Sequence, residues 1–100
     1  MEEYQSRFKD ENMDALFDAI LLLRTQEECY RFFEDLCTIP ELKSISQRWH
    51  VARKLGRGIT YQDISLETKA SSATISRVNR CLSYGTGGYA MMLERIGKED

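Results

Sequence analysis

The segment at residues 60–82, TYQDISLETKASSATISRVNRCL, constrains the fold of this chain more tightly than any other part of it. Thr60 followed three residues later by Asp63 is typical of a capped helix N-terminus. A few residues further on, Ser71 or Ser72 can cap a second helix. The segment therefore predicts two short helices joined by a tight turn.

The predicted second helix has one apolar side and one polar, basic side. Its apolar positions recur at i, i+3 and i+7, which places them on a single stripe. These positions are Ile75, Val78 and Leu82, and the opposite face carries Ala73, Ser76, Arg77 and Arg80, with Thr74 on its flank. Small side chains allow a neighbouring surface to come close, and guanidinium groups reach outward. The pattern is that of a helix-turn-helix, whose second helix enters the major groove of DNA.

We therefore expect residues 60–82 to contact double-stranded DNA. The expected contacts lie in the turn and on the outer faces of both helices: Gln62, Lys69, Ser72, Ala73, Thr74, Ser76, Arg77 and Arg80. Arg77 and Arg80 could instead be ordinary solvated charges, but their position opposite the apolar stripe favours DNA contact. Three further basic residues either solvate the end of the preceding helix or contact phosphates: Arg53, Lys54 and Arg57.

Charge is segregated along the chain, although its formal net charge is only −2. Residues 1–41 hold 4 basic and 11 acidic side chains (net −7), residues 42–82 hold 8 and 2 (net +6), and residues 83–100 hold 2 and 3 (net −1). Salt screens exposed charges beyond about 8 to 10 Å, so the acidic part does not cancel the central positive field. A local positive field of this kind attracts a phosphate backbone.

Length and composition exclude several classes of protein. We expect one domain spanning residues 1–100, without a membrane span, in the cytoplasm, because the longest apolar runs are too short to cross a bilayer. Cys29, Cys37 and Cys81 are odd in number, form no CxxC pair and accompany only one histidine, which predicts buried free thiols and no metal site. Nothing assembles a nucleophile, a base and an oxyanion site, so neither an enzyme nor a cofactor is expected.

Sparse glycine and proline, without strand-like alternation, predict an all-α chain of six helices. The first helix is expected from residue 4 or 8 to residue 24, and a second follows a capping box of Thr25 and Glu28. The third is expected from residues 38–41 to about residue 55, where glycines end it. After the two helices of the central segment, a last short helix is expected at residues 89–96.

The first two predicted helices carry more apolar surface than a 100-residue monomer would easily cover. The excess apolar side chains are Phe17, Leu21, Leu22, Leu23, Phe32 and Phe33. We therefore expect residues 1–37 to serve mainly as dimerisation helices, with a two-fold axis that aims two recognition helices at successive major grooves. The alternative is a monomer whose first helix packs over the rest of the chain.

Residues 42–96 resemble the tryptophan repressor family, and within it the YerC/YecD-type branch. The matching pieces are ELKSISQRWHVARKLGRG and ITYQDISLETKASSATISRVNRCL, and the motif SSATISRVNR after TYQDIS is the most specific. The resemblance implies an all-α, six-helix fold that forms an intertwined homodimer, and a transcriptional regulator, a repressor, that binds operator DNA. In the same way, Ser72, Ala73, Thr74 and Ser76 match the family's base-reading surface.

The resemblance also implies an effector pocket between the third helix and the recognition helix. In the family, two arginines grip an indole corepressor, and Arg48 and Arg77 occupy the matching positions here. The residue after the second arginine is a glycine in members that bind tryptophan, whereas it is Val78 in this chain, and a nearby serine is replaced by Cys81. A branched side chain in a slot sized for indole costs about 1–3 kcal/mol or excludes the ligand. We therefore expect regulation by a different small molecule or by none, not by tryptophan.

A second departure from the usual pattern lies in the turn. Helix-turn-helix units commonly place glycine at the bend, where φ is positive, and this chain has Lys69 there. A non-glycine residue in that conformation costs on the order of 1 kcal/mol, which is tolerable where the surroundings enforce it. Lys69 either reaches a phosphate or is simply solvated. The alternative for the whole chain is a helix-turn-helix retained as a protein-interaction module without specific DNA binding.

Overall fold

The computed structural model describes residues 4–97, and within that range it contains six α-helices and no strand. The helices are α1 (Glu11–Ile20), α2 (Gln26–Leu36), α3 (Ile39–Gly56), α4 (Tyr61–Thr68), α5 (Ser72–Tyr84) and α6 (Gly88–Gly97). The chain divides into two compact units, one before and one after the boundary between Thr38 and Ile39. The predicted all-α, six-helix architecture is confirmed; the prediction of one domain stays a prediction.

Three of the helices begin at the capping residues that the sequence predicts. The Thr60 hydroxyl accepts from the backbone N–H of Asp63 at 3.2 Å, and the Ser71 hydroxyl accepts from that of Thr74 at 3.1 Å. At the start of α2, the Thr25 hydroxyl accepts from the Glu28 N–H at 3.1 Å. Each contact satisfies a backbone donor that has no partner inside its helix.

The expected capping box before α2 is only half formed. The Glu28 carboxylate accepts from the backbone N–H of Arg24 at 2.8 Å, one residue before the N-cap. A standard capping box would have this carboxylate accept from Thr25 itself. This hydrogen bond from the Arg24 N–H to the Glu28 carboxylate holds the extended backbone that precedes α2.

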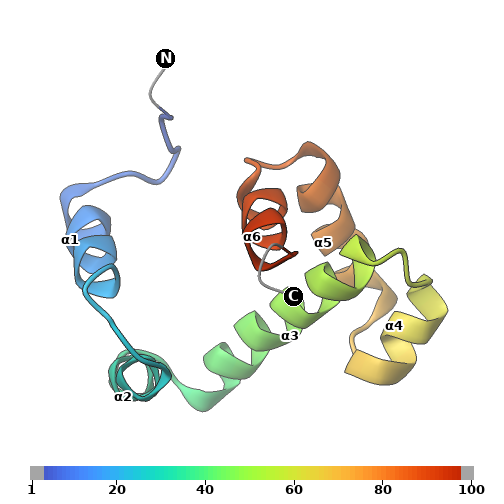
Figure 1. Cartoon of the computed structure of the whole chain (residues 1–100), viewed down its shortest axis with the longest axis horizontal. Helices are drawn as coiled ribbons and strands as arrows, with labels where there is room; N and C mark the ends of the chain where they lie inside the picture. The colour runs from blue at the N-terminus through green and yellow to red at the C-terminus, as the bar shows by residue number, and fades with distance from the viewer. Residues whose placement is uncertain (1–3, 98–100) are drawn as a thin grey trace. The chain divides into compact units, whose positions relative to one another are not determined.

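The core of the second unit lies where α3 meets α4 and α5 (Figure 1). Its buried side chains are Val51, Ala52, Ile64, Ala70, Ile75 and Val78. The predicted apolar stripe of α5 accounts for two of them, and Leu82 at its end is half-buried. Trp49 on α3 is stacked on Tyr89 of α6, with ring centroids 6.3 Å apart and planes 14° apart, which secures the last helix against this core.

The α4–α5 turn has the backbone geometry expected of a helix-turn-helix even though it lacks glycine. Lys69 adopts φ 62° and ψ 14°, the left-handed conformation, and its N–H donates to the carbonyl of Ser65 at 2.8 Å. The Ser65 hydroxyl donates to the carbonyl of Ala70 at 3.1 Å, and the N–H of Ala70 donates to the Thr68 hydroxyl at 3.2 Å. Buried Ala70 and these three hydrogen bonds enforce the strained conformation of Lys69.

The first helix is shorter than predicted at both ends. It begins after the N-cap Asp10, whose carboxylate accepts from the Met13 N–H at 2.7 Å. It ends at Ile20, because the N–H of Leu22 and Leu23 donate to carbonyls three residues back in tight turns. Helical spacing of apolar residues continues past this end, so spacing alone could not locate it.

The first unit leaves most of its apolar side chains exposed. No residue of α1 or α2 is buried, and Leu21 and Leu22 are 81% and 76% exposed. Phe17 is also exposed, whereas Phe32 and Phe33 are half-buried and meet edge to face at 5.8 Å. These are the surfaces that the sequence assigns to dimerisation.

The prediction that the three cysteines are buried is wrong for this chain. All three thiols are free, but Cys29 and Cys81 are exposed and Cys37 is half-buried. Whether a cysteine is buried depends on which face of its helix it occupies. Cys81 lies next to the apolar stripe of α5 but is not part of it. In residues 4–97, no helix is long and apolar enough to span a membrane, and no cluster of three metal-ligating side chains occurs.

Candidate nucleic-acid interface

The outer face of α5 presents the side chains that the sequence predicts to contact DNA. Five are exposed to solvent along the helix: Ser72, Ala73, Ser76, Arg77 and Arg80. They lie opposite Ile75 and Val78, whose side chains are 0% and 1% exposed. The core therefore fixes the rotation of α5 about its axis and leaves this face free for a ligand.

Thr74 is held differently from its neighbours. It is half-buried, and its hydroxyl oxygen accepts from the Ser71 hydroxyl at 3.1 Å while its N–H donates to the same Ser71 oxygen. The two residues form one hydrogen-bonded unit at the tip of α5. These hydrogen bonds fix the direction of the Ser71 and Thr74 hydroxyls at the start of the helix.

Two further predicted contacts flank α5. Gln62 is exposed in the first turn of α4, and Lys69 is exposed in the turn between the helices. Lys69 lies three residues before the first residue of α5. The structure thus brings Lys69 close along the chain to the α5 face and puts Gln62 at the far end of α4.

Replacement of Lys69 by glycine should separate backbone strain from charge. Glycine adopts the left-handed conformation without a Cβ penalty, so the variant should be more stable by about 0.5–1 kcal/mol. It also loses one positive charge, so the salt dependence of DNA binding should become shallower by about 1 if Lys69 contacts a phosphate. Thermal denaturation and titration at several salt concentrations measure the two effects, and a lower melting temperature would contradict the strain assignment.

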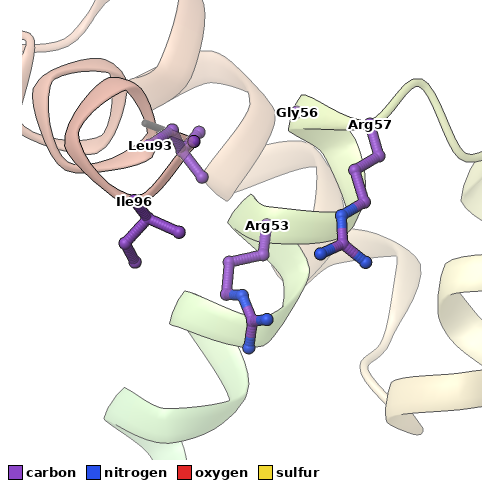
Figure 2. A pocket seen from close by; sticks show the side chains of 6 residues that line it. Arg53, Gly56, Arg57, Leu93 and Ile96 are labelled. Carbon is purple, nitrogen blue, oxygen red and sulfur yellow. The ribbon is translucent and has the colours of Figure 1, made fainter. Parts of the chain in front are cut away.

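The three basic residues at the end of α3 fall into two groups. The Lys54 ammonium pairs with the Glu67 carboxylate of α4 at 2.7 Å, and its side chain is only 21% exposed, so it is an internal partner and not a free phosphate contact. Arg53 and Arg57 are exposed, and together with Leu93 and Ile96 of α6 they line a hollow of about 180 Å³ (Figure 2).

Gly56 lines the hollow between α3 and α6 at a close approach of the two helices. Gly56 has no side chain, and a Cβ there would lie 3.2 Å from a Leu93 methyl. Arg53 and Arg57 extend from α3 beside this gap, while Leu93 and Ile96 extend from α6 (Figure 2). This site is formed by α3 and α6 and is distinct from the face of α5.

The Lys54–Glu67 pair predicts a specific response to acid. The hydrogen bond and charge of Lys54, with a smaller effect from His50, hold the pKa of Glu67 below its ordinary value of 4.5. A lowered folded-state pKa gives stability above the unfolded pKa that is lost as pH falls through the folded one. The difference in melting temperature between the wild type and Glu67→Gln should therefore be constant near neutral pH and shrink below about pH 4.5. A pH-independent difference would contradict the assignment.

The four predicted effector-pocket residues lie on α3 and α5, and their shared pocket stays a prediction. Arg48 is half-buried on α3 and lines a hollow of about 390 Å³ whose other residues all belong to α3: Pro40, Glu41, Ser44 and Ile45. Arg77 and Cys81 are exposed on α5, and Val78 is part of the core. None of these three residues lines the Arg48 hollow.

Sequence reasoning missed a polar contact that ties α3 to the end of α4. The Gln47 side-chain amide donates to the backbone carbonyl of Thr68 at 3.2 Å. The only sequence signal is the spacing of Gln47, His50 and Lys54, which lie on one side of α3 at i, i+3 and i+7. That spacing shows a shared face but not what the face contacts.

Comparisons with known proteins agree with this geometry. The sequence model of the Trp repressor protein family matches residues 11–97. The uncharacterized protein YerC of Bacillus subtilis (strain 168) is 54% identical over 90 residues, which are 90% of this chain and 86% of YerC. A candidate Trp repressor from Staphylococcus aureus superposes with a TM-score of 0.87 at 49% identity, over 91% of each chain. A TrpR-like protein from Eubacterium eligens ATCC 27750 superposes with a TM-score of 0.88 at 52% identity, over 91% of this chain and 94% of that one.

Proposed function

This chain belongs to the Trp repressor protein family, and we propose that it is a cytoplasmic, non-enzymatic transcriptional regulator, a repressor, that binds specific double-stranded DNA. The observation that carries the proposal is the face of α5. A buried stripe fixes the helix against α3 and α4, and hydroxyls, a small residue and two arginines stand exposed on the opposite side. A helix of this kind can place side chains at base edges in the major groove.

Within this proposal, the residues divide by role. Ser72, Ala73, Thr74 and Ser76 lie in the first turns of α5 and would read bases, directly or through water. The cationic and amide side chains at the edges would hold phosphates: Gln62, Lys69, Arg77 and Arg80. The net charge of +6 over residues 42–82 would attract the duplex before specific contacts form.

We also propose that the functional form is an intertwined homodimer. The support is the uncovered apolar surface of α1, α2 and the link between them, where Leu21 and Leu22 are largely exposed. A second copy would cover these side chains and bring two α5 helices onto one duplex. Light scattering on the purified chain should give twice the chain mass, and a monomer at all concentrations would exclude this form.

The proposed regulator does not respond to tryptophan. Val78 is 1% exposed and packs with Val51, Ala52 and Ile64, so it is a structural side chain and not the wall of an open slot. An indole ring between α3 and α5 would have to displace this packing. A small effector would therefore use other residues, and the hollows lined by Arg48 and by Arg53 with Arg57 are two candidate places for it.

The test is DNA binding by the full-length chain in a binding-site selection, followed by titration with the selected duplex. We expect a selected sequence, a steep fall in affinity with added salt, and no change when tryptophan is added. Enrichment of no sequence would exclude specific readout. Absence of any salt-dependent DNA binding would favour the protein-interaction module. Calorimetric titration that shows tryptophan binding with micromolar affinity would overturn the effector assignment.

A further inference from the structure

The C-terminal end of α4 is fastened to α3 at two points. The Gln47 amide donates to the Thr68 carbonyl at 3.2 Å, and the Lys54 ammonium pairs with the Glu67 carboxylate at 2.7 Å. The Thr68 carbonyl is among the last of its helix, where carbonyls have no partner inside the helix, and an ammonium near a helix C-terminus is favoured by the helix dipole. One contact therefore satisfies a backbone carbonyl at the end of α4, and the other pairs with a side chain there.

The spacing of the two fastening residues determines what the contacts can do. Gln47 and Lys54 are seven residues apart on one face of α3, which is about 10 Å along its axis. Their side chains converge on the adjacent residues Glu67 and Thr68. Two contacts from separated points resist rotation of α4 about a single contact, so together they fix the angle between the two helices.

The angle between α3 and α4 also determines the position of the recognition helix α5, because only three residues separate α4 from α5. Lys69, Ala70 and Ser71 follow Thr68 directly, and the turn they form is rigid because its backbone groups are hydrogen-bonded to Ser65 and Thr68. Any movement at the end of α4 therefore shifts the N-terminal turn of α5. That turn carries the proposed base-reading residues.

We propose that Gln47, Lys54 and Glu67 are positioning residues for DNA recognition, and that this α3–α4 latch sets the angle at which α5 meets the duplex without a bound ligand. The proposal rests on the proposed function. Base readout requires exact placement, whereas attraction of phosphates tolerates displacement. Loss of the latch should therefore reduce sequence specificity more than affinity for random DNA.

The sharpest test is Glu67→Gln, because a change of charge and a change of position affect different quantities. Removal of an acidic group makes the basic segment more positive, so electrostatics alone predicts tighter binding to every duplex. The latch predicts that the ratio of affinities for the selected duplex and a random duplex falls about fivefold to tenfold. Gln47→Leu, which changes no charge, should lower the ratio similarly without altering the salt dependence.

Two controls accompany this test. Asp63→Asn removes another exposed acidic group, in the first turn of α4, and should leave the ratio unchanged. The exchange of Lys54→Glu with Glu67→Lys restores an ion pair at constant net charge and should recover most of the specificity lost in Glu67→Gln. Helical circular dichroism checks that every variant is folded at the assay temperature. An unchanged ratio in Glu67→Gln and Gln47→Leu overturns the positioning role.

Hydrogen exchange separates failure of this proposal from failure of the proposed function. If the wild type binds no DNA, the proposed function fails, but the latch can still be judged from the amide protons of Lys69 and Ala70. Faster exchange of these amides in Glu67→Gln and Gln47→Leu would support a latch on the turn. Unchanged exchange in both variants would show that the contacts do not hold it.

Discussion

Replacement of Ile75 by alanine should destabilise the second unit more than any other single aliphatic truncation on α5. Ile75 is fully buried, one of six buried core residues among residues 4–97, and it packs where α5 meets α3 and α4. Removal of a buried isoleucine to alanine costs about 2–5 kcal/mol, because transfer free energy is lost and a cavity remains. For a domain of this size the melting temperature should fall by about 10 °C or more.

Leu66→Ala is the matched control for this prediction. It removes a side chain of the same size from α4, but Leu66 is 74% exposed, so a change within about 0.5 kcal/mol is expected. Both variants are compared by thermal denaturation at one protein concentration, because the proposed dimer would make the melting temperature concentration-dependent. Equal losses in the two variants would show that the packing of α5 is not what holds this unit together.

The helix ends that are set by local hydrogen bonds could be predicted from the sequence. Thr60, Ser71 and Thr25 cap their helices as the sequence indicates, because an N-cap depends on a hydroxyl and on an N–H three residues later. The end of α1 could not be predicted in this way. Apolar residues at helical spacing continue beyond Ile20, and the tight turns at Leu22 and Leu23 leave no mark in the spacing.

In the candidate site, too, local features could be predicted from the sequence and long-range contacts could not. The outer face of α5 follows from periodicity, since Arg77 and Arg80 must lie opposite whatever is buried. The Gln47–Thr68 contact joins residues 21 positions apart, and its acceptor is a backbone carbonyl that any residue could supply. Long-range contacts to backbone atoms carry no residue-specific signal, so only the structure reveals the latch.

Simultaneous replacement of Arg77 and Arg80 by glutamine should nearly abolish binding to the selected DNA while the protein stays folded. Both side chains are exposed on α5, so the melting temperature should change little. A hydrogen bond between an arginine and a charged phosphate contributes about 1.5–3 kcal/mol, and each such contact adds about 1 to the salt dependence. If both arginines contact DNA, the affinity for the selected duplex should fall by at least about thirtyfold.

The decisive comparison is with two arginines that lie elsewhere. The double variant Arg31→Gln with Arg95→Gln changes the net charge equally, and both of these residues are exposed, on α2 and α6. If α5 is the reading helix, this control should lose only the small affinity that follows from weaker overall attraction. Parallel losses in the two double variants would mean that net charge and not the face of α5 drives binding. A loss confined to the α5 variant, with a shallower salt dependence, places the duplex against Arg77 and Arg80.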